Sequence, residues 1–339
     1  MDAKKLAVGV DLGGTKIAAG VFDSRGRLLG ELVVTPSLAA GPAEGTSEAL
    51  LGAIDQALAG ASVRSDELEG IGVGAPGPLD PAAGNLLEVP TLPQLHYFPL
   101  RGTLLQRYEA RVEVNNDGNC FALGEALFGA ARGTGIVLGV TLGTGCGVGV
   151  VVEGRIHEGA TCNAGEVYRA LCGEKTFDET LSGPGLERLY LERCEAEKTG
   201  LEITALARAG DAGARDVFDL FAGELARGLG LLAAVVDPHI IVLGGSVATA
   251  FDCFGALLVE RIGEYIAPSA AEQLKIVPSA EAPASAAAGY NCKSCSVPLG
   301  WCTECVAERM RLEARAKPGP KPAPGPEAAP EPEPELVAA

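Results

Sequence analysis

Apolar runs and amphipathic stretches alternate along most of this chain, and their periods predict a mixed α/β protein. Short runs of small and β-branched residues are typical of strands, whereas Leu50, Leu51, Ile54 and Leu58 repeat at helical spacing. In the first part of the chain, strands are predicted over 6–10, 17–22, 28–34, 70–74 and 111–114, and helices over 44–60 and 118–128. This pattern indicates a mixed sheet with helices packed on it.

The same alternation returns after residue 125. Strands are predicted over 136–142, 148–153 and 239–243, and helices over 184–198, 213–236 and 251–266. Residues 281–290 are rich in Ala, Ser and Pro and are predicted to be a linker or a last helix, and 306–316 a short charged helix. Residues 317–339 are rich in proline and nearly lack large apolar residues, so they are predicted to be a disordered tail without a catalytic role.

Two of the predicted strands meet at a glycine pair that suits phosphate binding. Asp11 ends the first run, Gly13 and Gly14 form the tip of a hairpin, and Thr15 and Lys16 open the next run. Glycine lets a phosphate reach backbone N–H groups, while the hydroxyl and the ammonium lie within reach of the same oxygens. The carboxylate before the turn can hold a metal through water. The same residues could form an ordinary glycine hairpin with a solvated aspartate. Two downstream segments favour the phosphate-binding interpretation.

These downstream segments repeat the theme. Another strand, turn and strand is centred on Gly143, Thr144 and Gly145, and it could clamp the phosphates of one nucleotide from the opposite side. A buried type of strand ends in the pair Gly244 and Gly245, where adenosine can lie against bare backbone. The three segments together predict a nucleotide site.

In order and spacing these motifs resemble the ROK family of sugar kinases, within the actin/hexokinase ATPase superfamily. The matching segments are DLGGTK at the start, GAPGPLD at 74–80, NNDGN at 115–119, GTGCGVG at 143–149, AGE at 164–166, ETLSGPGLE at 179–187 and DPHIIVLGG at 237–245. The resemblance covers roughly residues 5–290. It implies two related ribonuclease H-like α/β lobes, 1–125 and 126–290, with the active site in the cleft between them. It also implies ATP and Mg²⁺ as cofactors and a homodimer.

The resemblance assigns the acceptor site as well. Asp117 matches the aspartate that accepts the proton of the sugar hydroxyl, and Asn116 would bind a neighbouring hydroxyl. Glu166 and Glu179 match positions that contact the sugar ring, and the backbone around Gly77 would close over it. Asp117 also stands where a helix is predicted to begin, so capping that helix is an alternative role, compatible with catalysis.

One segment departs from the family pattern. The family has Gly-His two residues after the first glutamate and then a CxCGxxGCxE zinc motif. Here the histidine is missing, Cys172 alone survives, and Ala170 and Phe177 stand at other cysteine positions, so no zinc is predicted at this place. Two interpretations follow. Either the pocket still phosphorylates a glucose-like hexose at its 6-hydroxyl, which we favour, or the chain is an N-acylhexosamine kinase or a non-catalytic sugar- or nucleotide-binding regulator.

Four of the ten cysteines form two CxxC pairs in a separate segment, 291–316. They are Cys292, Cys295, Cys302 and Cys305. Paired CxxC motifs can close a tetrahedral zinc site, which we predict here as a small structural module. Free thiols, an iron–sulfur cluster and a partner- or nucleic-acid-binding knuckle are the alternatives.

Composition limits the function classes. The chain has 339 residues, 47% of them hydrophobic, and can bury a large core. A net charge of −17 without Lys and Arg clusters argues against nucleic acid as a partner. No signal peptide is recognised, and the glycines in the apolar stretch 135–152 fit a hairpin better than a membrane span. We therefore expect a cytoplasmic enzyme without a membrane segment.

Overall fold

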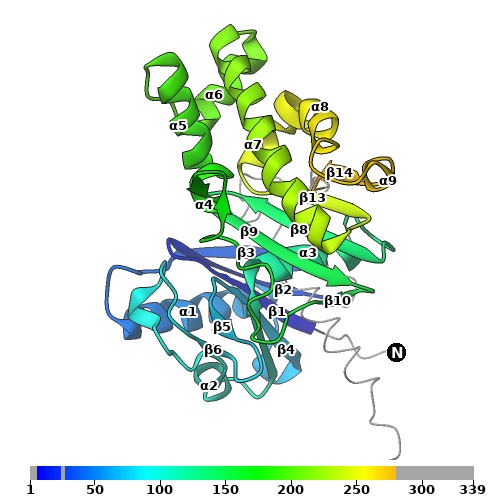
Figure 1. The fold of residues 1–339 in the computed structure, drawn as a ribbon. Coiled ribbons are helices and arrows are strands. Elements are labelled where there is room, and N and C mark those ends of the chain that lie inside the picture. The colour runs from blue at the N-terminus through cyan, green and yellow to red at the C-terminus, as the bar shows by residue number, and fades with distance from the viewer. Residues whose placement is uncertain (1–5, 24–26, 128, 280–339) are drawn as a thin grey trace, which may run out of the picture.

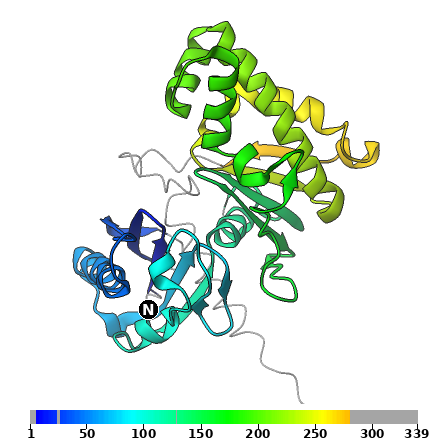
Figure 2. The same ribbon diagram turned by 60° about the vertical axis from the view of Figure 1, so that its left-hand side comes forward.

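The chain folds into two lobes, each built on a five-stranded mixed sheet (Figure 1, Figure 2). The computed structural model describes residues 6–23, 27–127 and 129–279. The first sheet has the order β3-β2-β1-β4-β7 and consists of β1 (Leu6–Leu12), β2 (Lys16–Phe22), β3 (Leu28–Pro36), β4 (Leu68–Ala75) and β7 (Arg111–Asn116). β1 pairs antiparallel with β2 and parallel with β4, and β7 runs parallel to β4.

The second sheet repeats this plan. It has the order β10-β9-β8-β13-β14 and consists of β8 (Ile136–Leu142), β9 (Cys146–Val152), β10 (Arg155–Ile156), β13 (Ile240–Gly244) and β14 (Lys275–Pro278). β8 pairs antiparallel with β9 and parallel with β13. Each lobe therefore carries a central strand that leads through a glycine turn into an antiparallel partner, which confirms the prediction of two related α/β lobes.

The first lobe buries one face of its sheet under a long helix. α1 (Ala43–Ala61) packs on β2 and β3, and Leu50, Ile54 and Leu58 face the core, as their spacing predicts. The smaller elements are η1 (Ser65–Glu67), β5 (Leu79–Asp80), β6 (Asn85–Leu86), η2 (Pro93–Leu95) and α2 (Leu100–Leu105).

α3 (Asp117–Leu127) leaves the first sheet but packs on the second, against β8 and β9. Two strand glycines make this approach possible. A Cβ on Gly139 would lie 2.7 Å from the Cα of Ala122, and a Cβ on Gly149 would overlap the carbonyl oxygen of Gly118. By packing, α3 belongs with the second lobe, and it runs across the predicted boundary at residue 125.

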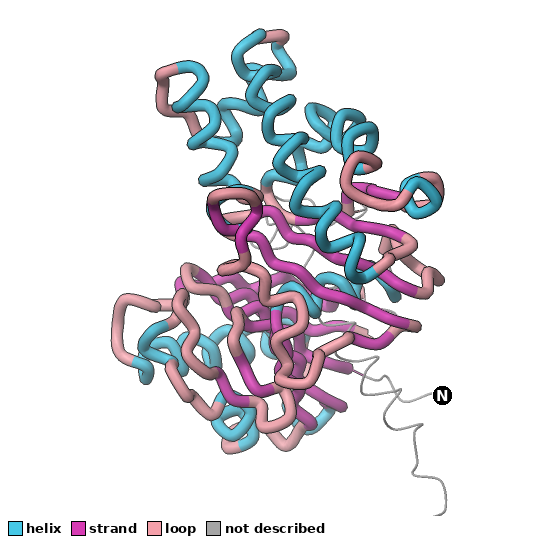
Figure 3. Tube along the Cα trace, in the orientation of Figure 1, coloured by secondary structure: helices cyan, strands magenta, loops and turns pink. Residues whose placement is uncertain are grey.

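The remaining helices belong to the second lobe (Figure 1). They are α4 (Phe177–Thr180), α5 (Gly183–Cys194), α6 (Gly200–Ala209), α7 (Ala212–Val236), η3 (Val247–Ala250), α8 (Phe251–Ile262) and α9 (Pro268–Ala271). The short hairpin β11 (Leu171–Cys172) and β12 (Lys175–Thr176) precedes α4. The helix predicted over 184–198 ends at Cys194, and α6, which the apolar pattern did not predict, begins at a Thr199–Glu202 capping box. Figure 3 shows the strands of both sheets in the middle of the molecule and most helices toward its two ends.

Several sequence predictions lie outside the described residues. They concern the zinc module at Cys292, Cys295, Cys302 and Cys305, the linker and charged helix, and the tail. These predictions, like the homodimer, stay predictions. Among the described residues, no helix is both long and apolar enough to cross a bilayer.

Candidate functional site

Residues at the carboxyl end of β7 connect the two lobes. The Asn115 amide donates a hydrogen bond to Glu158 Oε1 at 3.0 Å, and the Asn116 amide donates one to Glu166 Oε1 at 2.8 Å. Both glutamates belong to the segment between β10 and β11 of the second lobe. Asn116 and Glu166, which the sequence predicted to share a site, are therefore in direct contact. The bond of Asn115 to Glu158 was not predicted.

Asp117 stands at the first residue of α3, and its environment makes it a much weaker acid than usual. Burial, the largest cause, together with the negative charges of Asp11 and then Glu166, raises the pKa of Asp117 to about 7. Its Oδ1 accepts a hydrogen bond of 2.8 Å from the N–H of Gly118. The helix cap is made by the preceding residue, since Asn116 Oδ1 accepts a hydrogen bond of 3.2 Å from the N–H of Asn119. Capping therefore falls to Asn116 and not to Asp117.

The loop at Gly77 closes over this group of residues. A Cβ on Gly77 would overlap the carboxylate of Glu166 and lie 3.0 Å from the amide nitrogen of Asn116. Only glycine leaves room for that contact. The role predicted for the backbone at residue 77, closing over a sugar, stays a prediction.

Glu179 lies outside this cluster, contrary to its predicted place. Its exposed carboxylate turns back to the start of α4 and accepts hydrogen bonds from the N–H of Thr176 at 2.9 Å and from its hydroxyl at 2.8 Å. These bonds lower the pKa of Glu179. The sequence did contain a signal, because a threonine followed three residues later by a glutamate is the spacing of a capping box.

The neighbouring carboxylate, Asp178, takes the inward position instead. Its Oδ1 accepts a hydrogen bond of 2.7 Å from the N–H of Cys146, the first residue of β9. Burial raises the pKa of Glu166, and the charge of Asp178 raises it further. Asp178 therefore joins Asp11, Asp117 and Glu166 in one group of interacting carboxylates.

The first glycine turn has its own charged residues. Asp11 is buried at the end of β1, while Thr15 is exposed and Lys16 half-buried. The N–H of Gly13 donates to the Lys16 carbonyl at 2.9 Å, and a Cβ on Gly14 would lie 2.9 Å from the carbonyl oxygen of Thr91. A tight turn therefore lies next to a buried carboxylate. Carboxylate oxygens are ligands that Mg²⁺ prefers.

The second turn lies at the start of α5. The N–H of Gly143 donates to the Gly145 carbonyl at 3.0 Å, and the Gly143 carbonyl accepts from the N–H of Gly183 at 2.8 Å. Ser182 caps the 12-residue helix through a bond of 3.1 Å to the N–H of Gly185. The N-terminus of a helix favours negative charge, so an anion at this turn would be stabilised.

The third glycine segment lies beside the second turn. Gly244 pairs with Thr141 in the sheet, and Gly245, with a φ of +91°, packs so closely on the Leu142 backbone that a Cβ would overlap it. The Gly244–Gly245 pair therefore packs on the residue that directly precedes the second turn. The first turn belongs to the other lobe. Asp11 interacts with Asp117, and the next residue, Gly118, packs on the Val148 backbone of β9.

The segment that departs from the family zinc motif is packed by apolar groups. Phe177 is fully buried. A Cβ on Gly228 of α7 would lie 3.3 Å from the Phe177 ring and 3.1 Å from the Cys172 sulfur. The Cys172 thiol interacts with that of Cys146, and two thiols do not by themselves make a four-coordinate zinc site. Sequence and geometry therefore agree that this loop is braced by packing.

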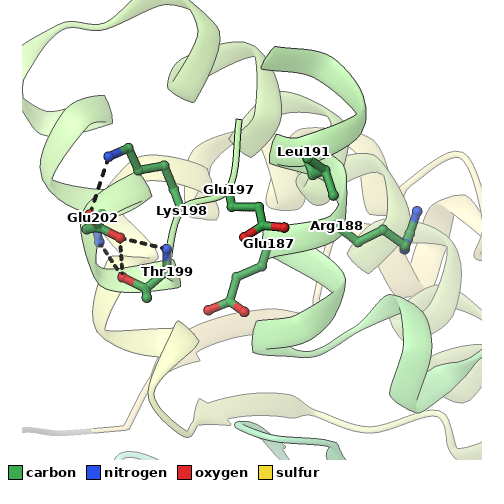
Figure 4. Close-up of a pocket in the computed structure, with 7 residues that line it drawn as sticks. All are labelled: Glu187, Arg188, Leu191, Glu197, Lys198, Thr199 and Glu202. Atoms are coloured by element: carbon green, nitrogen blue, oxygen red, sulfur yellow. Dashed lines mark hydrogen bonds and ion pairs between the residues drawn. The ribbon is translucent and has the colours of Figure 1, made fainter. Parts of the chain in front are cut away.

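A shallow hollow of about 490 Å³ lies between α5 and α6 in the second lobe (Figure 4). It is lined by Glu187, Arg188, Leu191, Glu197, Lys198, Thr199 and Glu202. Its polar groups largely pair with one another, since Glu202 accepts from Lys198 and Thr199, and Glu187 accepts from the N–H of Gly200. None of the acceptor-site residues described above lines it.

Comparison with known proteins agrees with the site. The ROK family model matches residues 7–291. The N-acetyl-D-glucosamine kinase of Citrobacter koseri is 33% identical over 282 residues, which cover 77% of this chain and 90% of that protein. The corresponding kinase of Pectobacterium carotovorum is also 33% identical, with the same coverage.

Two solved structures extend the comparison. The ROK hexokinase of Thermus thermophilus is 32% identical with a TM-score of 0.71, covering 90% of this chain and 99% of that one. A ROK family glucokinase from Streptomyces griseus, in complex with glucose and AMPPNP, is 28% identical with a TM-score of 0.69, covering 91% and 99%. The chain therefore belongs to the ROK family and is a sugar kinase of that family.

Proposed function

We propose that this protein transfers the γ-phosphoryl group of ATP to the 6-hydroxyl of a glucose-like hexose, with Asp117 as the general base. The observation that carries the proposal is the position of Asp117. It lies next to the hydrogen-bonded pair of Asn116 and Glu166, and its pKa is about 7. A base whose pKa is near the operating pH combines a useful fraction of the ionised form with a strong pull on the proton.

The acceptor would be held by polar groups that already face each other. A sugar entering this site loses water from several hydroxyls, and each of them needs a partner. Asn116 and Glu166 offer an amide and a carboxylate whose relative position is set by their own hydrogen bond of 2.8 Å. Phosphoryl transfer needs mainly positioning and charge stabilisation, so this arrangement suffices without a covalent intermediate.

The donor would lie between the two glycine turns, with adenosine along Gly244 and Gly245. The glucokinase of Streptomyces griseus binds the ATP analogue AMPPNP, which supports ATP as the donor here. Asp11 would hold Mg²⁺, and this ion, when bound, neutralises charge on the phosphates. Thr15 and Lys16 would approach the phosphates from the first lobe, and Gly143, Thr144 and Gly145 from the second.

N-acetylglucosamine is the second candidate acceptor. The curated relatives at 33% identity are N-acetyl-D-glucosamine kinases, whereas solved neighbours include a hexokinase and a glucokinase. The missing Gly-His after Glu166 changes the residues that would meet the sugar. Both sugars carry a free 6-hydroxyl, so the assay below includes both.

A coupled assay of ADP release with ATP–Mg²⁺ tests the proposal. The acceptors are glucose, fructose, mannose, allose, N-acetylglucosamine and N-acetylmannosamine. We expect strong turnover with one of them and a loss of about 10²–10⁴-fold in kcat for Asp117→Asn, because this change removes the base and keeps the shape. Glu174→Gln, an exposed carboxylate of the β11–β12 turn, is the matched control and should leave kcat unchanged.

Nucleotide binding, measured by calorimetry with AMPPNP, separates the alternatives. Asp117→Asn should bind AMPPNP as the wild type does, since the residue does not touch the phosphate turns directly. Full turnover in Asp117→Asn would remove Asp117 from its role. Nucleotide binding without turnover of any of the six sugars would contradict the kinase and favour a non-catalytic regulator.

A further inference from the structure

A second hydrogen bond between the lobes lies beside the one that joins Asn116 to Glu166. The Asn115 amide, in a side chain that is 5% exposed, donates to Glu158 Oε1 at 3.0 Å. Asn115 belongs to β7 in the first lobe, and Glu158 follows β10 in the second. Two consecutive residues of one strand end therefore hold two glutamates of the other lobe, and the proposed acceptor site uses only one of these pairs.

The neighbours of Asn115 determine which way its amide points. Its Oδ1 accepts from the N–H of Asn116 at 2.8 Å and from the Asn119 amide at 3.1 Å. A backbone N–H can only donate, so the atom that faces it must be the oxygen. The NH₂ group is therefore directed at the second lobe, where the Glu158 carboxylate accepts its hydrogen bond. Such a bond to an ionised carboxylate is stronger than a bond between two neutral groups.

Glu158 and Glu166 stand at the two ends of one folded loop. The Glu158 carbonyl accepts from the N–H of Ala164 at 3.1 Å, and the N–H of Glu166 donates to the Asn163 carbonyl at 3.1 Å. Gly159 has a φ of +74°, and a Cβ there would lie 3.1 Å from the Ala164 Cβ. Because the loop is closed on itself, a contact that holds Glu158 in place also limits where Glu166 can lie.

We propose that Glu158 is a positioning residue, whose bond to Asn115 holds the loop 158–166 on the first lobe and so keeps Glu166 in place for the sugar. This inference rests on the proposed function, since it assumes that Glu166 meets a sugar. A sugar that engages Asn116 and Glu166 would take over their mutual bond, whereas the bond between Asn115 and Glu158 would still join the loop to β7. Without the latter bond, fewer molecules have the loop in place before the sugar arrives. The apparent affinity for sugar then falls, while saturating sugar restores the arrangement.

Steady-state kinetics of the full chain, with the accepted sugar varied at saturating ATP–Mg²⁺, test this role. Glu158→Ala removes the bond to Asn115, and we expect the KM for sugar to rise by about fivefold to tenfold while kcat stays within about twofold. Glu158→Gln keeps an oxygen that accepts from Asn115, so its KM should stay within about threefold of the wild type. Glu174→Ala truncates an exposed carboxylate of the β11–β12 turn and is the matched control, which should leave both constants unchanged.

An exchange of the two partners isolates the pair. Asn115→Asp places a second carboxylate against Glu158, so the KM for sugar should rise by about tenfold or more. The new carboxylate can still accept from Asn116 and Asn119. In the double variant Asn115→Asp/Glu158→Gln, the amide and the carboxylate have changed places and the summed charge equals that of the wild type. Its KM should return to within about threefold of the wild type, because a directly interacting pair is not additive.

Thermal melts show which variants fold, and the exchange of partners decides the question if Glu158→Ala does not fold. An unchanged KM in Glu158→Ala, a loss of kcat without a rise in KM, or a double variant no better than Asn115→Asp would overturn the positioning role. Turnover by the wild type in the same assay would then leave the proposed function standing. Absence of wild-type turnover with every sugar would instead contradict the proposed function, and this inference with it.

Discussion

The two glycine turns come from the same strand, turn and strand pattern, yet their surroundings differ. Two residues before the first glycine, β1 carries Asp11, whereas β8 carries Thr141 at the same place. Asp11 raises the pKa of Asp117, while the Thr141 hydroxyl donates to the Gly147 carbonyl at 3.4 Å. The first turn thus has a negatively charged residue that interacts with the acceptor site. The corresponding residue of the second turn is uncharged.

The second turn obtains its charge from elsewhere in the chain. Asp178 brings a carboxylate to Cys146, and α5 brings the positive end of its dipole to Gly143. The glycines also differ in what they face: Gly14 faces the Thr91 backbone, and Gly145 faces the end of a side chain. The comparison teaches that a shared turn motif can be specialised by residues far away in sequence.

The largest expected difference between the turns is chemical. Asp11→Asn should lower kcat by about 100-fold or more, since it removes the proposed ligand of Mg²⁺ and a charge that tunes the base. Thr141→Val, the matching change in the second turn, should lower kcat by less than about tenfold, because it removes only a long hydrogen bond. The coupled ADP assay measures both. Equal losses in the two variants would mean that the turns are not chemically distinct.

A second prediction concerns the stability cost of the charge that surrounds Asp117. The pKa is about 7 in the folded protein and about 4 in an unfolded chain, so the folded state holds the proton more tightly. The contribution of Asp117 to wild-type stability should therefore be complete below about pH 4 and be lost as the pH rises through about 7. Asp117→Asn escapes this loss and should be more stable than the wild type at pH 8, by at most about 4 kcal/mol.

Denaturant unfolding of both proteins at pH 4, 6 and 8 measures this effect. The advantage of Asp117→Asn should shrink to nothing at pH 4. An advantage that is the same at all three values would assign it to some other cause, such as packing of the amide.

A third prediction uses the faces of the two glycines. In Gly14→Ala the new methyl group meets the Thr91 carbonyl at 2.9 Å, and backbone cannot move aside easily. We expect a loss of about 1–3 kcal/mol in the free energy of unfolding. In Gly145→Ala the methyl group meets the Asp178 carboxylate at 2.7 Å, which can rotate away, so the loss should stay below about 1 kcal/mol. Chemical denaturation measures both losses. A larger loss in Gly145→Ala than in Gly14→Ala would show that the Thr91 backbone yields more easily than the Asp178 side chain.

The smallest expected effect is that of Glu179→Gln. Because Glu179 is exposed and bonded to Thr176, the change should alter the KM for sugar by less than about twofold and weaken only the cap of α4. Sugar titrations in the ADP assay measure the KM. A large rise in KM would return Glu179 to the sugar site.

Much of the fold could be predicted because its signals are local. Alternating apolar runs marked both strands of each hairpin, and the spacing of Leu50, Ile54 and Leu58 marked the buried face of α1. The family resemblance assigned Asn116 and Glu166 to one sugar site, and the structure joins them by a hydrogen bond of 2.8 Å. The packing of α3 on the second sheet could not be predicted from local signals. It depends on Gly139 and Gly149, which lie in strands that follow α3 in the sequence.

The sequence by itself determined the two glycine hairpins, the repeated lobe plan and the position of Asp117 at a strand end, since each follows from neighbouring residues and their periodicity. The tertiary structure decided that Asp178 faces the second turn and that Glu179 faces solvent. The physical reason is that adjacent residues in a short helix point in different directions. Packing of Phe177 against α7 selects which of them points inward.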